Sequence, residues 1–168
     1  MSADNIAIAA AVVNTFASAS DAGRLSQQVE VSRRNVTRPN LADLQSFQSA
    51  NPVAGVIKVF VLPDDESIVD AETTRGSLII DYPVVIGIAA KPQEVDGNAD
   101  IDALHQLRQD LKDFFFRQES EYRLLGNPAV AIGIETITDC DKRALRDKRL
   151  FLSEFVVTFR GERSRFDD

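Results

Sequence analysis

The sequence predicts an α+β domain with a mainly antiparallel sheet of about five strands and two helices packed on one face of that sheet. Two long segments, residues 77–90 and 149–160, alternate apolar and polar side chains with the period of a strand. Two others, residues 6–19 and 100–114, place apolar side chains at helical spacing. The elements follow one another in the order α-β-β-β-α-β-β. Because the strands come in runs, this order favours antiparallel pairing over a parallel α/β sheet.

Each predicted helix has one apolar stripe that can pack on the sheet. The first helix has Ser2 or Asp4 as its cap and stops at Gly23. Its stripe consists of Ile6, Ala9, Val13 and Phe16. The second helix begins near Asp100, where a cluster of acids suits the positive end of the helix dipole. Its stripe consists of Ile101, Leu104, Leu107, Leu111 and Phe114.

The shorter strands are expected at residues 29–32, 56–62 and 130–138. In the segment 77–90 one face carries Leu78, Ile80, Tyr82, Val84, Ile86 and Ile88. Pro83 has no backbone donor, which indicates an edge position or a bulge. In the last strand one face carries Phe151, Phe155, Val157 and Phe159, and the other carries Glu154, Thr158 and Arg160. Residues 35–51 are predicted to be a long connection with a helical turn around residues 41–44, and residues 66–76 fit either a loop or a strand.

Residues 1–168 are predicted to form a single domain that ends in a short flexible tail, residues 161–168. The net charge of −7 argues against broad affinity for nucleic acid or anionic membranes. One cysteine excludes an intrachain disulfide framework, and one histidine excludes most histidine-based metal sites. The apolar N-terminal segment has no preceding Lys or Arg and is too short to span a bilayer. A protein that is cytoplasmic, or assembled from the cytoplasm, is therefore expected.

No catalytic residue, cofactor or metal site is predicted. His105 has no partner nucleophile or carboxylate in any motif, and the acids beside Cys140 would raise its thiol pKa rather than lower it. Acidic clusters at residues 64–66 and around Asp139 could in principle bind Mg²⁺, but no phosphate-binding glycine loop accompanies them. A small Mg²⁺-dependent phosphoryl-transfer enzyme is therefore the alternative of a different class.

A series of local segments, spread over most of the chain, carries a resemblance to a known family. The N-terminal helix leads into Val29-Glu30-Val31-Ser32-Arg33-Arg34, and the strand Lys58-Val59-Phe60-Val61-Leu62-Pro63 follows. An acidic segment ending in Thr74-Arg75-Gly76 precedes Tyr82-Pro83-Val84-Val85-Ile86-Gly87-Ile88. Later come Leu111-Lys112-Asp113-Phe114-Phe115 and Leu145-Arg146-Asp147-Lys148-Arg149-Leu150-Phe151. In this order the segments resemble the tail terminator (neck, or head–tail joining) proteins of long-tailed bacteriophages.

The resemblance implies a small α+β protein of the virion tail and neck, assembled in the host cytoplasm and without catalytic residues. Such proteins form a ring, typically a hexamer, that caps the tail tube and offers a surface to the head connector. The implied partners are further copies of the chain, the tail tube protein and the head-completion or connector protein. Genomic DNA would pass through the lumen without specific binding, since an acidic lining repels phosphate. Another phage connector, such as a head-completion or tail-tube component, is the nearer alternative.

Two charged segments provide the predicted assembly surface. Residues 64–75 carry five acids and one base, a local charge of −4, so this segment is expected to be mobile until basic partners order it. Its acids are Asp64, Asp65, Glu66, Asp70 and Glu72. The basic partners expected on a neighbouring copy are Lys142, Arg143, Arg146 and Arg149, and the tail tube is the other candidate partner. An acidic surface loop with no partner is the alternative interpretation.

Overall fold

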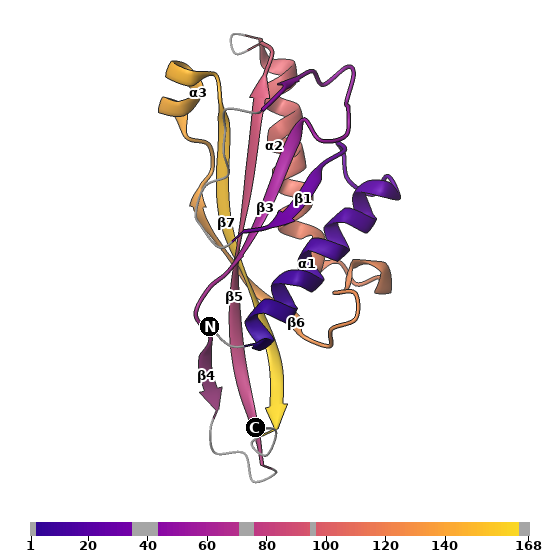
Figure 1. Cartoon of the computed structure of the whole chain (residues 1–168), viewed down its shortest axis with the longest axis vertical. Coiled ribbons are helices and arrows are strands. Elements are labelled where there is room, and N and C mark those ends of the chain that lie inside the picture. Colours follow the sequence, from indigo (N-terminus) through magenta and orange to yellow (C-terminus); the bar gives the residue numbers. More distant parts are fainter. Residues whose placement is uncertain (1–2, 35–43, 71–75, 95–96, 165–168) are drawn as a thin grey trace.

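The computed structural model describes residues 3–34, 44–70, 76–94 and 97–164 (Figure 1). Its helices are α1 (Ala3–Asp21), α2 (Asn98–Asp113) and α3 (Lys142–Lys148), and two 3-10 turns, η2 (Phe114–Phe116) and η3 (Ser120–Tyr122), follow α2. Its strands are β1 (Glu30–Arg33), β2 (Ser46–Phe47), β3 (Ile57–Pro63), β4 (Ser67–Asp70), β5 (Ser77–Pro92), β6 (Val130–Thr138) and β7 (Phe151–Ser164). The predicted α+β class is confirmed. The expected counts were too low, because the described part of the chain holds seven strands and three helices.

The strands form one mixed sheet with the main order β1-β3-β5-β7-β6, and β2 and β4 pair with β5. The β3–β5, β4–β5, β5–β7 and β6–β7 pairs are antiparallel, whereas β1 runs parallel to β3 and β2 runs parallel to the end of β5. A parallel pair needs a long crossover, and the connection between β1 and β3 has that length. The helical turn expected around residues 41–44 falls almost wholly on residues 35–43, which lie outside the described residues.

β5 and β7 are the longest strands and run along most of the molecule (Figure 1). They pair continuously from Ser77 with Ser164 to Ala90 with Phe151. Together with β4, the lower ends of β5 and β7 extend beyond α1 and α2, and we call this part the arm (β4, residues 77–81 and residues 160–164). The expected flexible tail at residues 161–168 was wrong for residues 161–164, because β5 supplies them with a pairing partner. Residues 165–168 lie outside the described residues.

Pro83 lies in the centre of the sheet and not at an edge, because β7 pairs with β5 on one side and β3 and β4 on the other. The Pro83 carbonyl accepts a hydrogen bond from the Asp64 amide at 3.0 Å. In an antiparallel strand the N–H and C=O of one residue point to the same side. The missing donor of Pro83 therefore faces the turn between β3 and β4, where no ladder partner is required.

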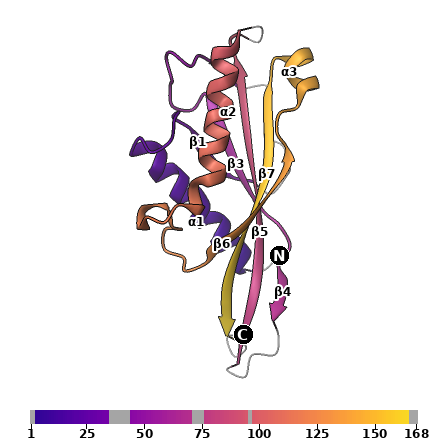
Figure 2. The ribbon, with the colours of Figure 1, turned by 180° about the vertical axis from the view of Figure 1, so that it is seen from behind.

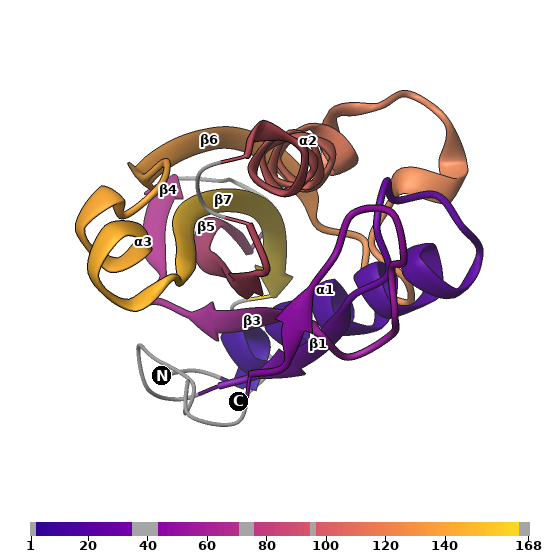
Figure 3. The same cartoon turned by 90° about the horizontal axis from the view of Figure 1, so that it is seen from above.

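The core lies between one face of the sheet and the helices α1 and α2. The face predicted to be apolar on β5 and β7 is the buried one, with Ile86 and Phe155 fully buried, and Leu104 of α2 packs there. Phe16 of α1 meets Phe114 edge to face, with ring centroids 5.4 Å apart. Figure 2 shows α2 running along the upper part of β5 and β7. In Figure 3 these two strands lie between α1 and α2 on one side and α3 on the other. Two helices thus pack on one face, as predicted.

The buried face of α1 is rotated from the predicted stripe. Ile6 is 40% exposed, whereas Asn5 and Thr15 are buried beside apolar neighbours. Both buried polar side chains have partners: the Asn5 amide donates to the Asp64 carbonyl, and the Thr15 hydroxyl donates to the Ala11 carbonyl and accepts from the Leu125 amide. A polar side chain with such partners can be buried at little cost. The pattern of apolar residues in the sequence therefore does not reveal which polar side chains of α1 are buried.

A second, smaller apolar cluster covers the opposite face of the sheet near α3. Phe60 and Leu150 belong to it, and Ala144 of α3 packs against it. The Phe60 ring lies directly over Gly87 of β5, where an added Cβ would come within 1.9 Å of the ring. The N-terminus of α3 is capped by Asp141, whose carboxylate accepts a hydrogen bond from the Ala144 amide at 3.0 Å. Its C-terminus is capped by Arg149, which adopts the left-handed conformation with φ 53°.

Candidate functional site

The acidic segment predicted for assembly begins directly after β3. Asp64 and Asp65 are exposed, and the Asp65 amide donates to the Asp64 carboxylate at 2.8 Å. Residues 67–70 then form β4, which pairs with β5 of the same chain. The described part of this segment is thus ordered by the chain itself, and the expectation that it is mobile in the monomer was wrong for residues 64–70. Glu72 lies outside the described residues.

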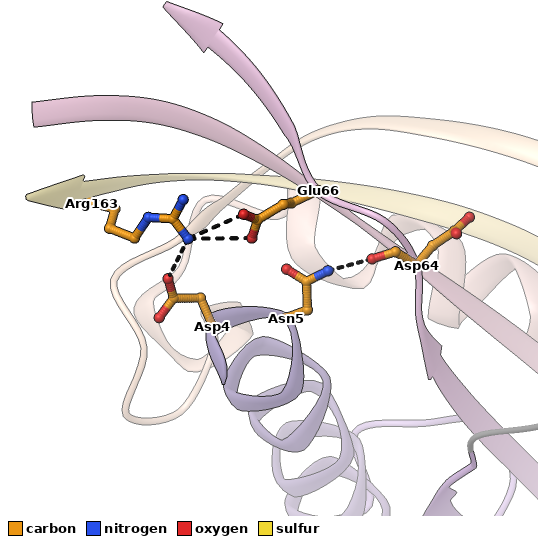
Figure 4. Close-up of polar contacts among 5 residues, drawn as sticks. All are labelled: Asp4, Asn5, Asp64, Glu66 and Arg163. Carbon is orange, nitrogen blue, oxygen red and sulfur yellow. Dashed lines mark hydrogen bonds and ion pairs between the residues drawn. The ribbon is translucent and has the colours of Figure 1, made fainter. Parts of the chain in front are cut away.

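Glu66 takes part in an ion-pair cluster within the chain (Figure 4). One guanidinium nitrogen of Arg163 lies 3.1 Å from the Glu66 carboxylate and 3.2 Å from the Asp4 carboxylate. All three side chains are partly shielded from solvent, with Glu66 the most shielded at 23% exposure. Tyr82 lies beside them, and burial, followed by the Asp4 carboxylate, raises the pKa of its phenol. The cluster therefore joins the start of α1, the β3–β4 turn and the end of β7.

Because Arg163 already pairs with Glu66, this acid is a poor candidate for binding a neighbouring copy. The Asn5 amide adds a second link by donating to the Asp64 carbonyl, while the Asp64 carboxylate points away from this bond (Figure 4). Asp64, Asp65 and Glu66, the acids of this surface whose side chains the structure describes, are therefore of two kinds. Glu66 holds the turn in place, whereas the carboxylates of Asp64 and Asp65 are presented to solvent.

The basic segment predicted for assembly is α3, at the other end of the molecule from β4 (Figure 1). Its bases are exposed, and they are Lys142, Arg143, Arg146, Lys148 and Arg149. Asp147 neutralises part of this charge, since it lies 2.9 Å from Arg146 and 3.8 Å from Arg143. Among the described residues no ion pair joins α3 to Asp64 or Asp65 of the same chain. α3 and the acidic segment are therefore both open to other molecules.

β6 is an exposed edge strand that the sequence did not identify as a site. It pairs only with β7 among the described strands, and two register shifts interrupt that pairing. Its exposed apolar side chains are Val130 (63%), Ile132 (44%), Ile134 (36%) and Ile137 (51%). On β4, Ile68 (56%) and Val69 (49%) are exposed in the same way. The alternation in the sequence predicted strand β6 correctly, but alternation does not reveal whether a neighbouring element covers the apolar side.

The candidate reactive groups have structural surroundings. His105 packs edge to face on Phe151 at 5.2 Å, and burial, followed by Arg108, lowers the pKa of its imidazole. Burial raises the pKa of the Cys140 thiol. Asp139 is held by Arg108, which donates to its carbonyl at 2.7 Å and lies 3.2 Å from its carboxylate. Within the described ranges no group of three or more His, Cys, Asp or Glu side chains could hold a metal ion.

Among the described helices, none is both long and apolar enough to cross a membrane. In comparisons with known proteins, no family model and no curated protein matches the chain.

Proposed function

We propose that the chain is the subunit of a ring that caps the tail tube of a long-tailed bacteriophage and joins it to the head connector. The proposal starts from the resemblance of the local segments to tail terminator proteins. It is supported by the way these segments fold, because their described residues lie in α1, β1, β3, β5, the end of α2, the end of α3 and the first residue of β7, all in one α+β domain. Under this proposal the chain acts in the virion by binding other proteins, and DNA passes through the ring.

The observation that carries the proposal is the uncovered apolar edge on β6. An apolar edge strand in water can pair with other chains, and soluble monomers usually protect such edges with charge, bulges or a covering element. β6 has two register shifts, but its apolar side chains remain exposed. On β6, Glu135 is the only charged residue within the strand. A ring covers such an edge in a controlled way, because each copy offers it to one neighbour.

The proposal is tested by disabling the gene in a phage genome that carries it and examining the lysate by electron microscopy. Loss of a cap that ends tube growth should leave DNA-filled heads and separate tails of uncontrolled length. Adding the purified protein should restore joining of heads to tails. Loss of a tail-tube component would leave no tails, and loss of a head-completion protein would leave tails of normal length. Either of these results would refute the tail terminator and support the other connector.

A further inference from the structure

We propose that copies of this chain join head to tail by pairing β4 of one copy antiparallel with β6 of the next, with the Asp64–Asp65 carboxylates set against α3. This contact deepens the proposed ring and rests on it, because it names the two edges through which neighbouring subunits meet.

The two strands lie on opposite edges of the sheet. β7 pairs with β5 along the whole stretch from Ser77 to Ala90, so β4 must pair with the other side of β5. β6 lies beyond β7. Each of the two strands has one paired neighbour and one free edge among the described elements. A contact between different edges of identical subunits is heterologous, and contacts of this kind close into rings.

The side chains on the two edges match in character and direction. Ile68 pairs across the ladder with Ile80, and Ile134 pairs with Val157. Ile80 and Val157 are both buried in the main core, so Ile68 and Ile134 lie on the same face of the sheet. If β4 and β6 of two copies form one continuous sheet, Ile68 can lie opposite Ile134. Each isoleucine then covers apolar surface that is exposed in the single chain.

Charge decides the direction of pairing. Residues 141–149, which include α3 and follow β6, carry five bases and two acids, a local charge of +3. With Ile68 opposite Ile134, antiparallel pairing brings Asp64 next to Thr138, at the end of β6 nearest α3. Parallel pairing would instead bring Asp64 to the start of β6. The nearby residues 117–123 carry two bases and two acids there, and so offer no net attraction. Complementary charge therefore favours the antiparallel arrangement.

A second copy is the occupant that the chain itself supports. Each of these two edges lacks what the other supplies: β4 has two apolar side chains after a pair of acids, and β6 has a longer apolar strip before a group of bases. A symmetric contact between two β6 strands would leave the β4 edge uncovered. The head-to-tail contact covers both edges in every copy of a closed ring.

Disulfide trapping tests this contact in the full chain. The parent variant is Cys140→Ser, which removes the native thiol. In this parent, the double variant Ile68→Cys/Ile134→Cys should form a ladder of covalent oligomers under mild oxidation at high protein concentration. A mixture of the two single variants should stop at covalent dimers, and each single variant alone should form none. Antiparallel partners approach within the range that a disulfide spans.

The control for register is Ile68→Cys/Glu135→Cys, in which the second cysteine is one residue away and on the other face of the sheet. It should give at least fivefold less cross-linking than the Ile134 pair. Equal cross-linking, or dimers from Ile134→Cys alone, would overturn the inference. Circular dichroism of each variant separates this outcome from a failure to fold.

Charge exchange gives an independent reading. Asp64→Lys/Asp65→Lys should weaken assembly measured by sedimentation, and Arg143→Glu/Arg146→Glu should do the same. Combining all four substitutions in one chain should restore assembly, because each contact regains opposite charges. Failure of the combined variant to recover would contradict the charge arrangement.

These tests also separate this inference from the proposed function. Rings that form without cross-linking between positions 68 and 134 would overturn this contact and leave the proposed tail terminator function in place. A ladder that builds only open filaments would support the contact and count against the ring. If neither rings nor the Ile68–Ile134 cross-link form, this contact and the proposed ring are both overturned.

Discussion

Gly87 is a position where one added methyl group has a clear physical consequence. Its Cβ would meet the Phe60 ring at 1.9 Å, and Phe60 is itself a buried residue of β3 within the apolar cluster around Leu150. We expect Gly87→Ala to lower the free energy of unfolding by about 1–3 kcal/mol, because an overpacked core must shift side chains or backbone. Urea denaturation measures this loss.

Gly133 is the matched control, since it also lies in a strand and a Cβ there meets nothing within 4 Å. Gly133→Ala should change stability little or raise it slightly. If the two substitutions cost the same, the close approach of Phe60 does not determine the effect at Gly87.

Asp100 is a buried acid whose charged carboxylate stabilises the fold by accepting backbone hydrogen bonds. Its carboxylate accepts from the Ser49 amide at 2.8 Å and from the Glu94 amide at 3.3 Å. Burial alone would raise the pKa of this carboxyl, but these backbone hydrogen bonds outweigh burial and hold its pKa below the ordinary value. A lowered folded pKa means that the stabilisation is complete above the ordinary pKa of about 4 and is lost as pH falls through the folded value.

We therefore expect Asp100→Asn to cost about 1–2 kcal/mol at pH 7, because an amide replaces a charged acceptor. The difference from the parent should narrow as pH falls below about 4, where the parent carboxyl becomes protonated. Urea denaturation midpoints of both proteins across this range provide the measurement. A difference that stays constant down to pH 2 would mean that the charge of Asp100 is not the source of the stability.

At the scale of elements, Arg163 connects three parts that are distant in sequence. It lies against Asp4 at the start of α1 and Glu66 before β4, and it belongs to β7. Removing it leaves two carboxylates near each other and near the phenol of Tyr82. We expect Arg163→Met to increase hydrogen exchange of the amides of residues 64–70 and of the first amides of α1 that are hydrogen-bonded within the helix, while α2 keeps its protection.

Arg123→Met is the control for this change. Arg123 is exposed, and its substitution removes the same charge at a position away from the cluster. It should leave exchange in residues 64–70 unchanged. If both variants exchange alike, overall charge rather than the Arg163 cluster controls the opening of the arm.

The elements that the sequence predicts well are those with long, regular patterns. β5, β7 and α2 bury the faces that their periodicity indicates, and β6 has the predicted bounds. β2 and β4 are too short for a periodic signal, and the parallel pairing of β1 with β3 depends on contacts distant in sequence. α3 forms within a segment recognised only as charged, because its Asp141 cap and left-handed Arg149 define its ends.

The candidate site divides in the same way. The charged groups could be found from the sequence because charge is a property of single residues. The partners of these charged groups could not be predicted from the sequence. Glu66, for example, binds Arg163 of the same chain, which is too distant in sequence for any local pattern to indicate. The apolar edge of β6 likewise depends on which elements fail to cover it, and only the assembled sheet determines that.

At the scale of the whole molecule, the net charge of −7 is the main determinant of whether the protein binds DNA. Binding to duplex DNA depends largely on Lys and Arg contacts that release counterions from phosphates. The bases of α3 form the densest positive group, but Asp147 pairs with two of them, and in the proposed contact Asp64 and Asp65 of a neighbour also oppose this group. A ring of such subunits should therefore let DNA pass without retaining it.

We expect fluorescence anisotropy of a labelled duplex to show no saturable binding at about 150 mM salt, either to the free chain or to assembled rings, because neither offers a continuous basic surface. Lowering the salt to about 50 mM should leave the result unchanged, since weaker screening also strengthens the repulsion between the acidic protein and phosphate.

Asp147→Asn, which frees Arg143 and Arg146 from their acid partner, is the sensitive comparison. It should raise DNA affinity of the free chain more than that of the ring, in which Asp64 and Asp65 of the neighbour still oppose these bases. Saturable binding by the parent that weakens steeply with added salt would instead reveal a basic surface that holds DNA, and would contradict a passage through which DNA slides.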